Sequence, residues 1–215
     1  MAKFVEKIGK YSEYILKGFS FLRKKSPIEN KATLKEFLLT RAAFISQKTL
    51  YGYIKTRAGT KYVTIFNDDR FNNSVNIAKW NIYILCLSDL TLYSINYINS
   101  QMKLQDTHNI FQWYNEIFTE ELGNIPIEIN KENIINNFTQ KLSQITQGKN
   151  FENSNLFQGS AASLVQWAPV SEQFKKEDEE IVLNSMKFKW KYIRDEFLRL
   201  LRNNELIHNW DSKVL

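Results

Sequence analysis

The residues whose types could do chemistry are few, and the most informative of them is one aspartate. Asp89 is the only charged residue between Lys79 and Lys103, in the most apolar stretch of the chain. A carboxylate within a buried helix must be paired, hydrogen-bonded or protonated, because burial disfavours its charged form. One interpretation of Asp89 is a ligand anchor or acid–base group in a polar pocket. The other is a structural ion pair, or a position at a solvent edge.

Basic residues upstream are the candidate partners of this carboxylate. Arg41, Lys48 and Lys55 follow one another at intervals of seven residues, so they roughly share one face of a helix. Arg57 lies in the same segment. The chemistry that this arrangement would support is hydrolysis at an unusual site, with Asp89 set against the basic face of that helix.

Other kinds of active site have little support in the sequence. There are two histidines, His108 and His208, and one cysteine, Cys86. There is one E-x-x-H spacing, Glu205 with His208, whereas a di-iron bundle requires two such motifs and two further glutamates. The chain has no G-x-S-x-G turn for a hydrolase nucleophile and no glycine-rich phosphate loop. We therefore expect no metal site, no cofactor and no intramolecular disulfide.

Charge is divided unevenly along the chain, which carries 29 basic and 23 acidic residues, a net charge of +6. Residues 1–61 hold 14 Lys or Arg and 4 Asp or Glu, whereas residues 62–215 hold 15 and 19. The first part is thus strongly basic and the remainder mildly acidic. Any electrostatic role is therefore expected within residues 1–61.

The first 25 residues combine apolar and basic side chains at helical spacing. They predict a basic amphipathic helix over residues 3–24, which either is peripheral to the bundle or packs on it and exposes its lysines. A helix of this kind lies on an anionic membrane or docks in the groove of a partner protein. The residues expected to make this contact are Lys3, Phe4, Lys7, Lys10, Lys17, Arg23, Lys24 and Lys25.

Neither a membrane span nor a secretory signal is expected. Residues 80–102 are long enough to cross a bilayer, but Asp89 and many polar side chains favour a buried helix of a bundle. Lys7, Lys10 and Glu13 interrupt the apolar residues near the N-terminus, where a secretory signal would need an uncharged run. The single cysteine also suits a reducing compartment. The sequence therefore predicts a cytoplasmic protein.

The function predicted from these features is a non-enzymatic helical protein that docks to a membrane surface or a partner complex through its basic N-terminal region. If that region binds lipid, the protein is peripheral on the inner membrane. Two alternatives stay open: a small esterase-like hydrolase with an atypical site, and nonspecific nucleic-acid binding. The second alternative has the charge that it needs, but no recognition motif accompanies the charge.

The elements that must position these residues are predicted to be helices. Seven glycines and three prolines are too few for the tight turns of a sandwich or barrel. Thr33 with Glu36 predicts a capping box, and Gly59 a helix end. The apolar periodicity predicts an all-α single-domain bundle of about six helices, with the main domain over residues 33–210. The predicted helices of that domain cover 34–57, 69–99, 108–121, 131–147, 161–167 and 171–203, with a connector at 60–66 and a loop at 149–160.

Two stretches carry a resemblance to known proteins. They are LKEFLLTRAAFISQKTLYGYIKTRAGTKY with FNDDRFNNSVNIAKWNIYILCLSDLTLYS, in residues 34–94, and LVQWAPVSEQFKKEDEEIVLNSMKFKWKYIRDEF, residues 164–197. Both resemble a family of small helical proteins of alphaproteobacteria, some of them labelled esterase. The label implies ester hydrolysis, although this chain lacks the nucleophile turn of serine esterases. The polar residues of these stretches that we expect in one pocket are Arg41, Lys48, Arg57, Asp89, Trp190 and Arg194.

Overall fold

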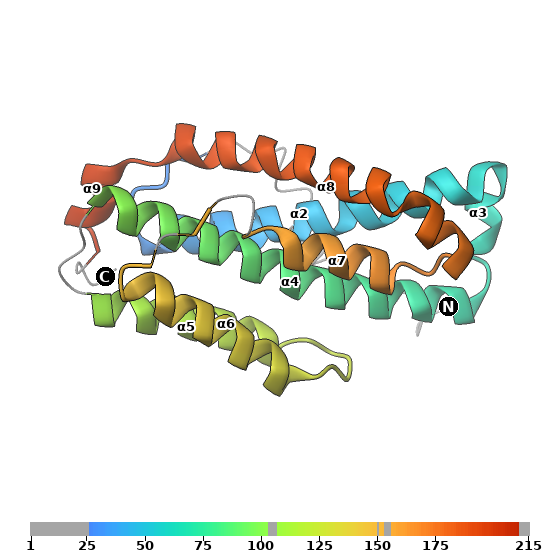
Figure 1. The fold of residues 1–215 in the computed structure, drawn as a ribbon, viewed down its shortest axis with the longest axis horizontal. Helices are drawn as coiled ribbons and strands as arrows, with labels where there is room; N and C mark the ends of the chain where they lie inside the picture. Colours follow the sequence, from blue (N-terminus) through green and yellow to red (C-terminus); the bar gives the residue numbers. More distant parts are fainter. Residues whose placement is uncertain (1–25, 103–106, 150, 153–155, 211–215) are drawn as a thin grey trace, which may run out of the picture.

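The protein is an all-α bundle, as predicted (Figure 1). The computed structural model describes residues 26–102, 107–149, 151–152 and 156–210. The helix predicted over residues 3–24, together with its eight contact residues, lies outside this part of the chain. Within the described ranges the helices pack around one hydrophobic core.

Helix α2, Lys31–Ala58, begins three residues before the predicted start because Asn30 caps it. The Oδ1 atom of Asn30 accepts a hydrogen bond from the backbone N–H of Thr33 at 2.9 Å, and Thr33 Oγ1 accepts one from the N–H of Asn30 at 3.2 Å. The predicted capping box of Thr33 and Glu36 is therefore wrong by one turn. The helix ends at Gly59 as predicted, where a φ of 53° favours glycine.

Helix α4, Asp69–Met102, is the central element and packs against α2. Its middle is buried on nearly every side, as Ile84, Cys86 and Leu87 show. The apolar run at 80–102 is thus a core helix of the bundle, as predicted. Among the described residues, no helix combines the length and the apolar character that crossing a membrane requires.

Helices α5, Thr107–Gly123, and α6, Lys131–Thr146, form a hairpin beside α4, at the bottom of Figure 1. The rings of Phe118 and Phe138 stack between them with centroids 3.8 Å apart. Helix α6 begins at residue 131 as predicted, and Asn130 caps it by accepting a hydrogen bond from the N–H of Asn133 at 3.0 Å. This hairpin holds one exposed face of α6 close to α4, and that face forms one wall of the candidate site described below.

Helices α7, Gln158–Trp167, and α8, Glu172–Leu200, complete the bundle. Helix α7 begins three residues before its predicted start, so the last part of the predicted loop at 149–160 is helical. Helix α8 ends at Leu200 and not at residue 203, because Leu201 takes an extended conformation beside Ile28. The N–H of Ile28 donates to the Leu200 carbonyl and the N–H of Arg202 to the Ile28 carbonyl, both at 2.9 Å. A short helix, α9, Asn203–His208, follows.

The β-prone residues between α2 and α4 are also helical. Residues Gly59–Lys61 form a 3-10 turn, η2, and Tyr62–Ile65 form a single turn, α3. With no strand beside it in the described part of the chain, this segment satisfies its backbone groups locally. The ring of Phe66 packs edge-on against Tyr62 and Phe71, with centroids 5.3 and 5.4 Å apart. The segment is a connector, as expected, and it is helical.

Candidate functional site

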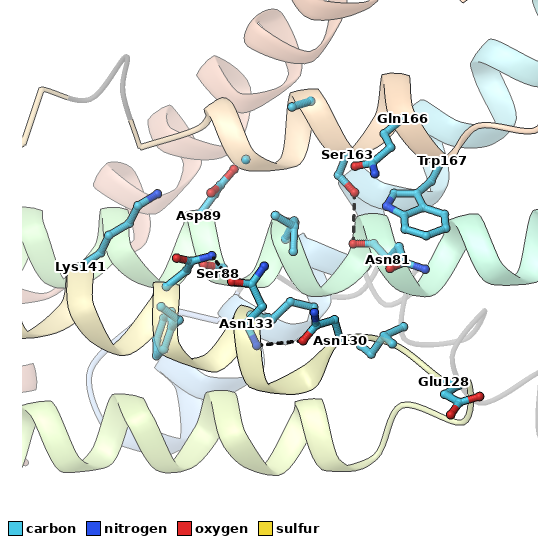
Figure 2. Close-up of a pocket in the computed structure, with 17 residues that line it drawn as sticks. Asn81, Ser88, Asp89, Glu128, Asn130, Asn133, Lys141, Ser163, Gln166 and Trp167 are labelled. Carbon is cyan, nitrogen blue, oxygen red and sulfur yellow. Dashed lines mark hydrogen bonds between the residues drawn. The ribbon is translucent and has the colours of Figure 1, made fainter. Parts of the chain in front are cut away.

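A groove of about 960 Å³ lies between α4, α6 and α7 (Figure 2). Its polar lining combines side-chain amides, hydroxyls and a few charges. Helix α4 forms its base, α6 one wall and α7 the other, so residues from three separate parts of the sequence meet there. The polar and aromatic residues that line the groove are Asn81, Ser88, Asp89, Glu128, Asn130, Asn133, Asn137, Phe138, Lys141, Ser163, Gln166 and Trp167.

Asp89 lies at the base of this groove and is 2% exposed. Its Oδ2 atom accepts a hydrogen bond of 2.7 Å from the backbone N–H of Ser160, in the first turn of α7. The residue at the N-cap position, Phe157, makes no side-chain cap bond. Asp89 therefore caps α7 from another helix and places a carboxyl group at the positive end of the helix dipole.

Gly159 allows the two helices to approach this closely. A Cβ atom at position 159 would lie 3.0 Å from Oδ1 of Asp89 and 3.3 Å from Cδ1 of Leu85. Contacts this short are rarely tolerated in a packed interior. The absence of a side chain at Gly159 thus brings the start of α7 onto Asp89, and this contact defines one end of the groove.

Burial raises the pKa of Asp89 from 3.8 to about 7, although the hydrogen bonds from Ser160 and the charge of Lys141 act in the opposite direction. In Figure 2 the Lys141 side chain extends from α6 towards this carboxyl group. Burial also raises the pKa of the neighbouring Cys86 thiol, with the nearby Asp89 as a further cause. Near neutral pH the groove therefore holds a carboxyl group divided between two protonation states, and the Cys86 thiol in the core beside it is neutral.

Ser160 connects Asp89 to the core. While its N–H bonds to Asp89, its Oγ accepts a 3.0 Å hydrogen bond from the Trp190 indole N–H. Trp190 is fully buried on α8 and packs on Phe157, with ring centroids 4.6 Å apart. Two of the predicted pocket residues, Asp89 and Trp190, are thus brought together through a serine that the sequence analysis had not selected.

The structure does not bring the other predicted pocket residues to Asp89. Arg41 forms a buried two-hydrogen-bond ion pair with Glu196, and Arg57 pairs with Asp178, in both cases joining α2 to α8. Lys48 is exposed on α2. The Arg194 guanidinium lies 5.5 Å from the Phe157 ring centroid. The basic face of α2 therefore does not meet Asp89, because two carboxylates of α8 hold its arginines.

Helix α6 contributes side chains to the groove that were not predicted from the sequence. Asn133 and Asn137 lie one turn apart on its exposed surface, and Asn137 Nδ2 donates a 3.3 Å hydrogen bond to Asn133 Oδ1. The available signal was a helix face carrying amides at a spacing of four residues where charged side chains are commoner on an exposed helix. That signal becomes meaningful only once α6 is known to face α4 and α7.

The groove is lined by groups that form hydrogen bonds, and they are not arranged as a catalytic pair. The hydroxyl of Ser163 donates to the Asn81 carbonyl at 3.2 Å, and no histidine or cysteine is among the described residues that line the groove. A serine–histidine pair for ester hydrolysis is therefore not assembled at this place. In the described ranges, no three or more His, Cys, Asp or Glu side chains gather in a way that could hold a metal ion.

Comparison of the chain with protein-family models, with curated proteins and with solved structures found no match. Function is therefore inferred from the groove and the surfaces themselves.

Proposed function

We propose that this protein is a binding protein and that the groove between α4, α6 and α7 is its ligand site. The observation that carries the proposal is that five side-chain amides, from three helices and the N-cap of α6, line the same groove as one buried carboxyl group. A concave site with a few converging polar groups and one strongly perturbed acid is the usual form of a small-molecule site. Asp89 would then serve both to cap α7 and to present its second oxygen to a ligand.

The lining indicates the chemistry of this ligand. Amides donate and accept hydrogen bonds equally, and the two charges near the rim, Glu128 and Lys141, have opposite signs. Trp167 stands at one end of the groove and is 38% exposed, so a flat molecular face can stack on its indole. We therefore expect a small polar ligand of low net charge that carries several hydroxyl or amide groups.

Replacing the two α6 amides together, Asn133→Ala with Asn137→Ala, is expected to weaken ligand binding by about tenfold or more, because each amide is a lost hydrogen-bond partner. The probes are monosaccharides, polyols, nucleosides and zwitterionic amino acids, screened by thermal shift and then titrated by calorimetry. Both positions are exposed on a helix, so alanine keeps the fold.

Asn136→Ala is the matched control, since Asn136 is exposed on the same helix but does not line the groove. If no probe of any class raises the melting temperature, the groove is not a site for this kind of ligand. Equal affinity in the double variant and the wild-type protein would likewise contradict the proposal.

A second candidate function is docking to an anionic membrane or a partner complex through the basic N-terminal region. The concentration of basic residues in residues 1–61 favours it, and the described half of this region keeps Lys48, Lys55 and Lys61 exposed. Basic surfaces of this kind bind anionic lipid with roughly 1 kcal/mol per lysine near the surface. The charge therefore extends beyond the predicted helix onto α2.

Deleting residues 1–25 is expected to abolish flotation of the protein with vesicles that contain anionic lipid, because seven basic residues are removed with the segment. Vesicles of neutral lipid are the control and should recover neither protein. Equal recovery of the full-length and shortened proteins with anionic vesicles would contradict the membrane version. A retained affinity for nucleic acid that falls steeply with salt would favour the nucleic-acid alternative.

A further inference from the structure

Helix α8 has a second apolar face that the described elements leave exposed. Ile181 and Phe188 are seven residues apart, so they lie along one line of the helix, and Phe174 continues this line to a ring that the Arg57 guanidinium of α2 covers at 4.4 Å from the ring centroid. We call this line the outer stripe. Ile181 and Phe188 are 69% and 75% exposed. In Figure 1, α8 runs along the upper edge of the bundle.

The outer stripe is distinct from the core face of the same helix. The core face, which includes Val182, Met186 and Trp190, is buried against α2 and α7. A surface helix that needs only one apolar face ordinarily keeps polar residues on the other. An exposed line of large apolar side chains with polar residues on both sides is typical of a protein–protein contact.

Charge along α8 indicates what covers the stripe. Residues 172–180 carry five acidic and two basic side chains, whereas residues 186–200 carry five basic and two acidic ones. One acid in each half, Asp178 and Glu196, is already paired with α2. Two further ion pairs lie within α8 itself, Lys175 with Glu172 and Lys191 with Asp195, both at 2.8 Å on its surface. The helix therefore presents an acidic first half and a basic second half on either side of Ser185. Such a pattern is complementary to itself when two copies run in opposite directions.

We propose that the outer stripe of α8 binds the outer stripe of a second copy of this chain, with the two helices antiparallel. The two-fold axis would pass close to Ser185 and set Ile181 of each copy against Phe188 of the other. The same alignment sets Glu177 against Lys191 and Glu180 against Lys187, since these pairs lie on the same side of the stripe. Two-fold symmetry makes every one of these contacts twice.

The N-terminal segment of the same chain fits the stripe less well. Residues 1–25 carry seven basic and two acidic side chains. The chain enters the bundle at Ile28, which bonds to Leu200 and Arg202 at the end of the basic half of α8. Docking of this segment on α8 from that point would set its most basic residues, 23–25, beside a basic surface. A second copy instead places opposite charges together.

The proposal is tested with the full-length protein by sedimentation equilibrium over a concentration series. The wild-type protein should show a monomer–dimer equilibrium, and Ile181→Glu or Phe188→Glu should raise its dissociation constant by about 100-fold or more, because each change buries two like charges across the axis. Val63→Glu is the matched control, since Val63 is 77% exposed on α3 and is not part of the outer stripe, and it should leave the constant unchanged.

Reversing the charges of one ion pair across the interface distinguishes the antiparallel α8 dimer from dimers formed through other surfaces. Glu177→Lys and Lys191→Glu should each weaken the dimer about 3–10-fold, and the two changes together should restore it. A full-length protein that stays monomeric at every concentration overturns the proposal, as does a dimer that tolerates Ile181→Glu. A monomer that dimerises only after removal of residues 1–25 also overturns it, since the segment would then be the occupant of the stripe.

Discussion

Asp89→Asn is expected to make the protein more stable at pH 8 and to leave its stability nearly unchanged at pH 4. The pKa of Asp89 is raised from 3.8 to about 7 by burial, so the folded state disfavours the ionised carboxylate. Between pH 3.8 and about pH 7, the pKa values of Asp89 in the unfolded and folded states, the folded protein binds more protons than the unfolded chain. The free energy of unfolding therefore falls as the pH rises through this range. The loss approaches about 4 kcal/mol above pH 7. Asparagine has no charge to bury and keeps an oxygen for the Ser160 N–H.

The measurement is the free energy of unfolding in urea from pH 4 to pH 8 for both proteins. The wild-type curve should decline through this window relative to the variant, and the difference should level off above the folded-state pKa. Asp89→Ala serves as the companion variant. At pH 4 it should be about 1–3 kcal/mol less stable than either, because the buried Ser160 N–H loses its acceptor. Parallel wild-type and Asp89→Asn curves would show that Asp89 is not a buried, proton-binding carboxyl group.

Arg41→Ala is expected to destabilise the protein by about 3–5 kcal/mol, because it leaves the buried Glu196 carboxylate without its cation. The pair consists of two hydrogen bonds of 3.0 Å, and both side chains are almost completely shielded from water. Arg41 also donates to Thr40 Oγ1 at 3.1 Å. The double variant Arg41→Met with Glu196→Leu removes both charges and should lie within about 1–2 kcal/mol of the wild-type protein.

Chemical unfolding of Arg41→Met, of Glu196→Leu and of the double variant gives the coupling energy as a double-mutant cycle. Lys35→Ala is the matched control, because Lys35 forms an exposed ion pair with Glu120, also between two helices. That change should cost about 1 kcal/mol or less. A similar small cost for Arg41→Ala would mean that Glu196 finds water or another cation when Arg41 is removed.

The sequence predicted the bundle well because the apolar periodicity and the end signals of a helix lie within its own segment. The apolar periodicity of α4 and the caps at Asn130 and Gly59 needed no knowledge of other segments. The end of α8 did need it, since the extended conformation at Leu201 depends on Ile28. The early start of α7 likewise depends on Asp89, a residue of a different helix. The errors at the end of α8 and the start of α7 therefore occur where a distant part of the chain decides the backbone, whereas the error at the start of α2 is local, since Asn30 and Thr33 form its cap.

The candidate site was only partly predictable for the same reason. Isolation in an apolar run singled out Asp89 but did not decide between a buried pocket and a solvent edge, and the ion pairs of Arg41 and Arg57 are made with residues more than 100 positions away. Spacing shows which residues share a helix face and not which helix that face meets. The amides of Asn133 and Asn137 were passed over because an exposed amide has no special chemistry until another polar wall stands opposite.

The contact between Ile28 and Leu201 also has a consequence for the order of folding. It closes a loop of about 170 residues, and the entropy cost of such a closure is met only after other contacts have shortened the loop. The α5–α6 hairpin, in contrast, joins neighbours in the sequence and can form early. Asn209, whose side chain donates to the Glu29 carbonyl at 3.0 Å, belongs to the same late closure. The contacts of Ile28 with Leu201 and of Glu29 with Asn209, at the end of the bundle, are therefore expected to form last and to open first.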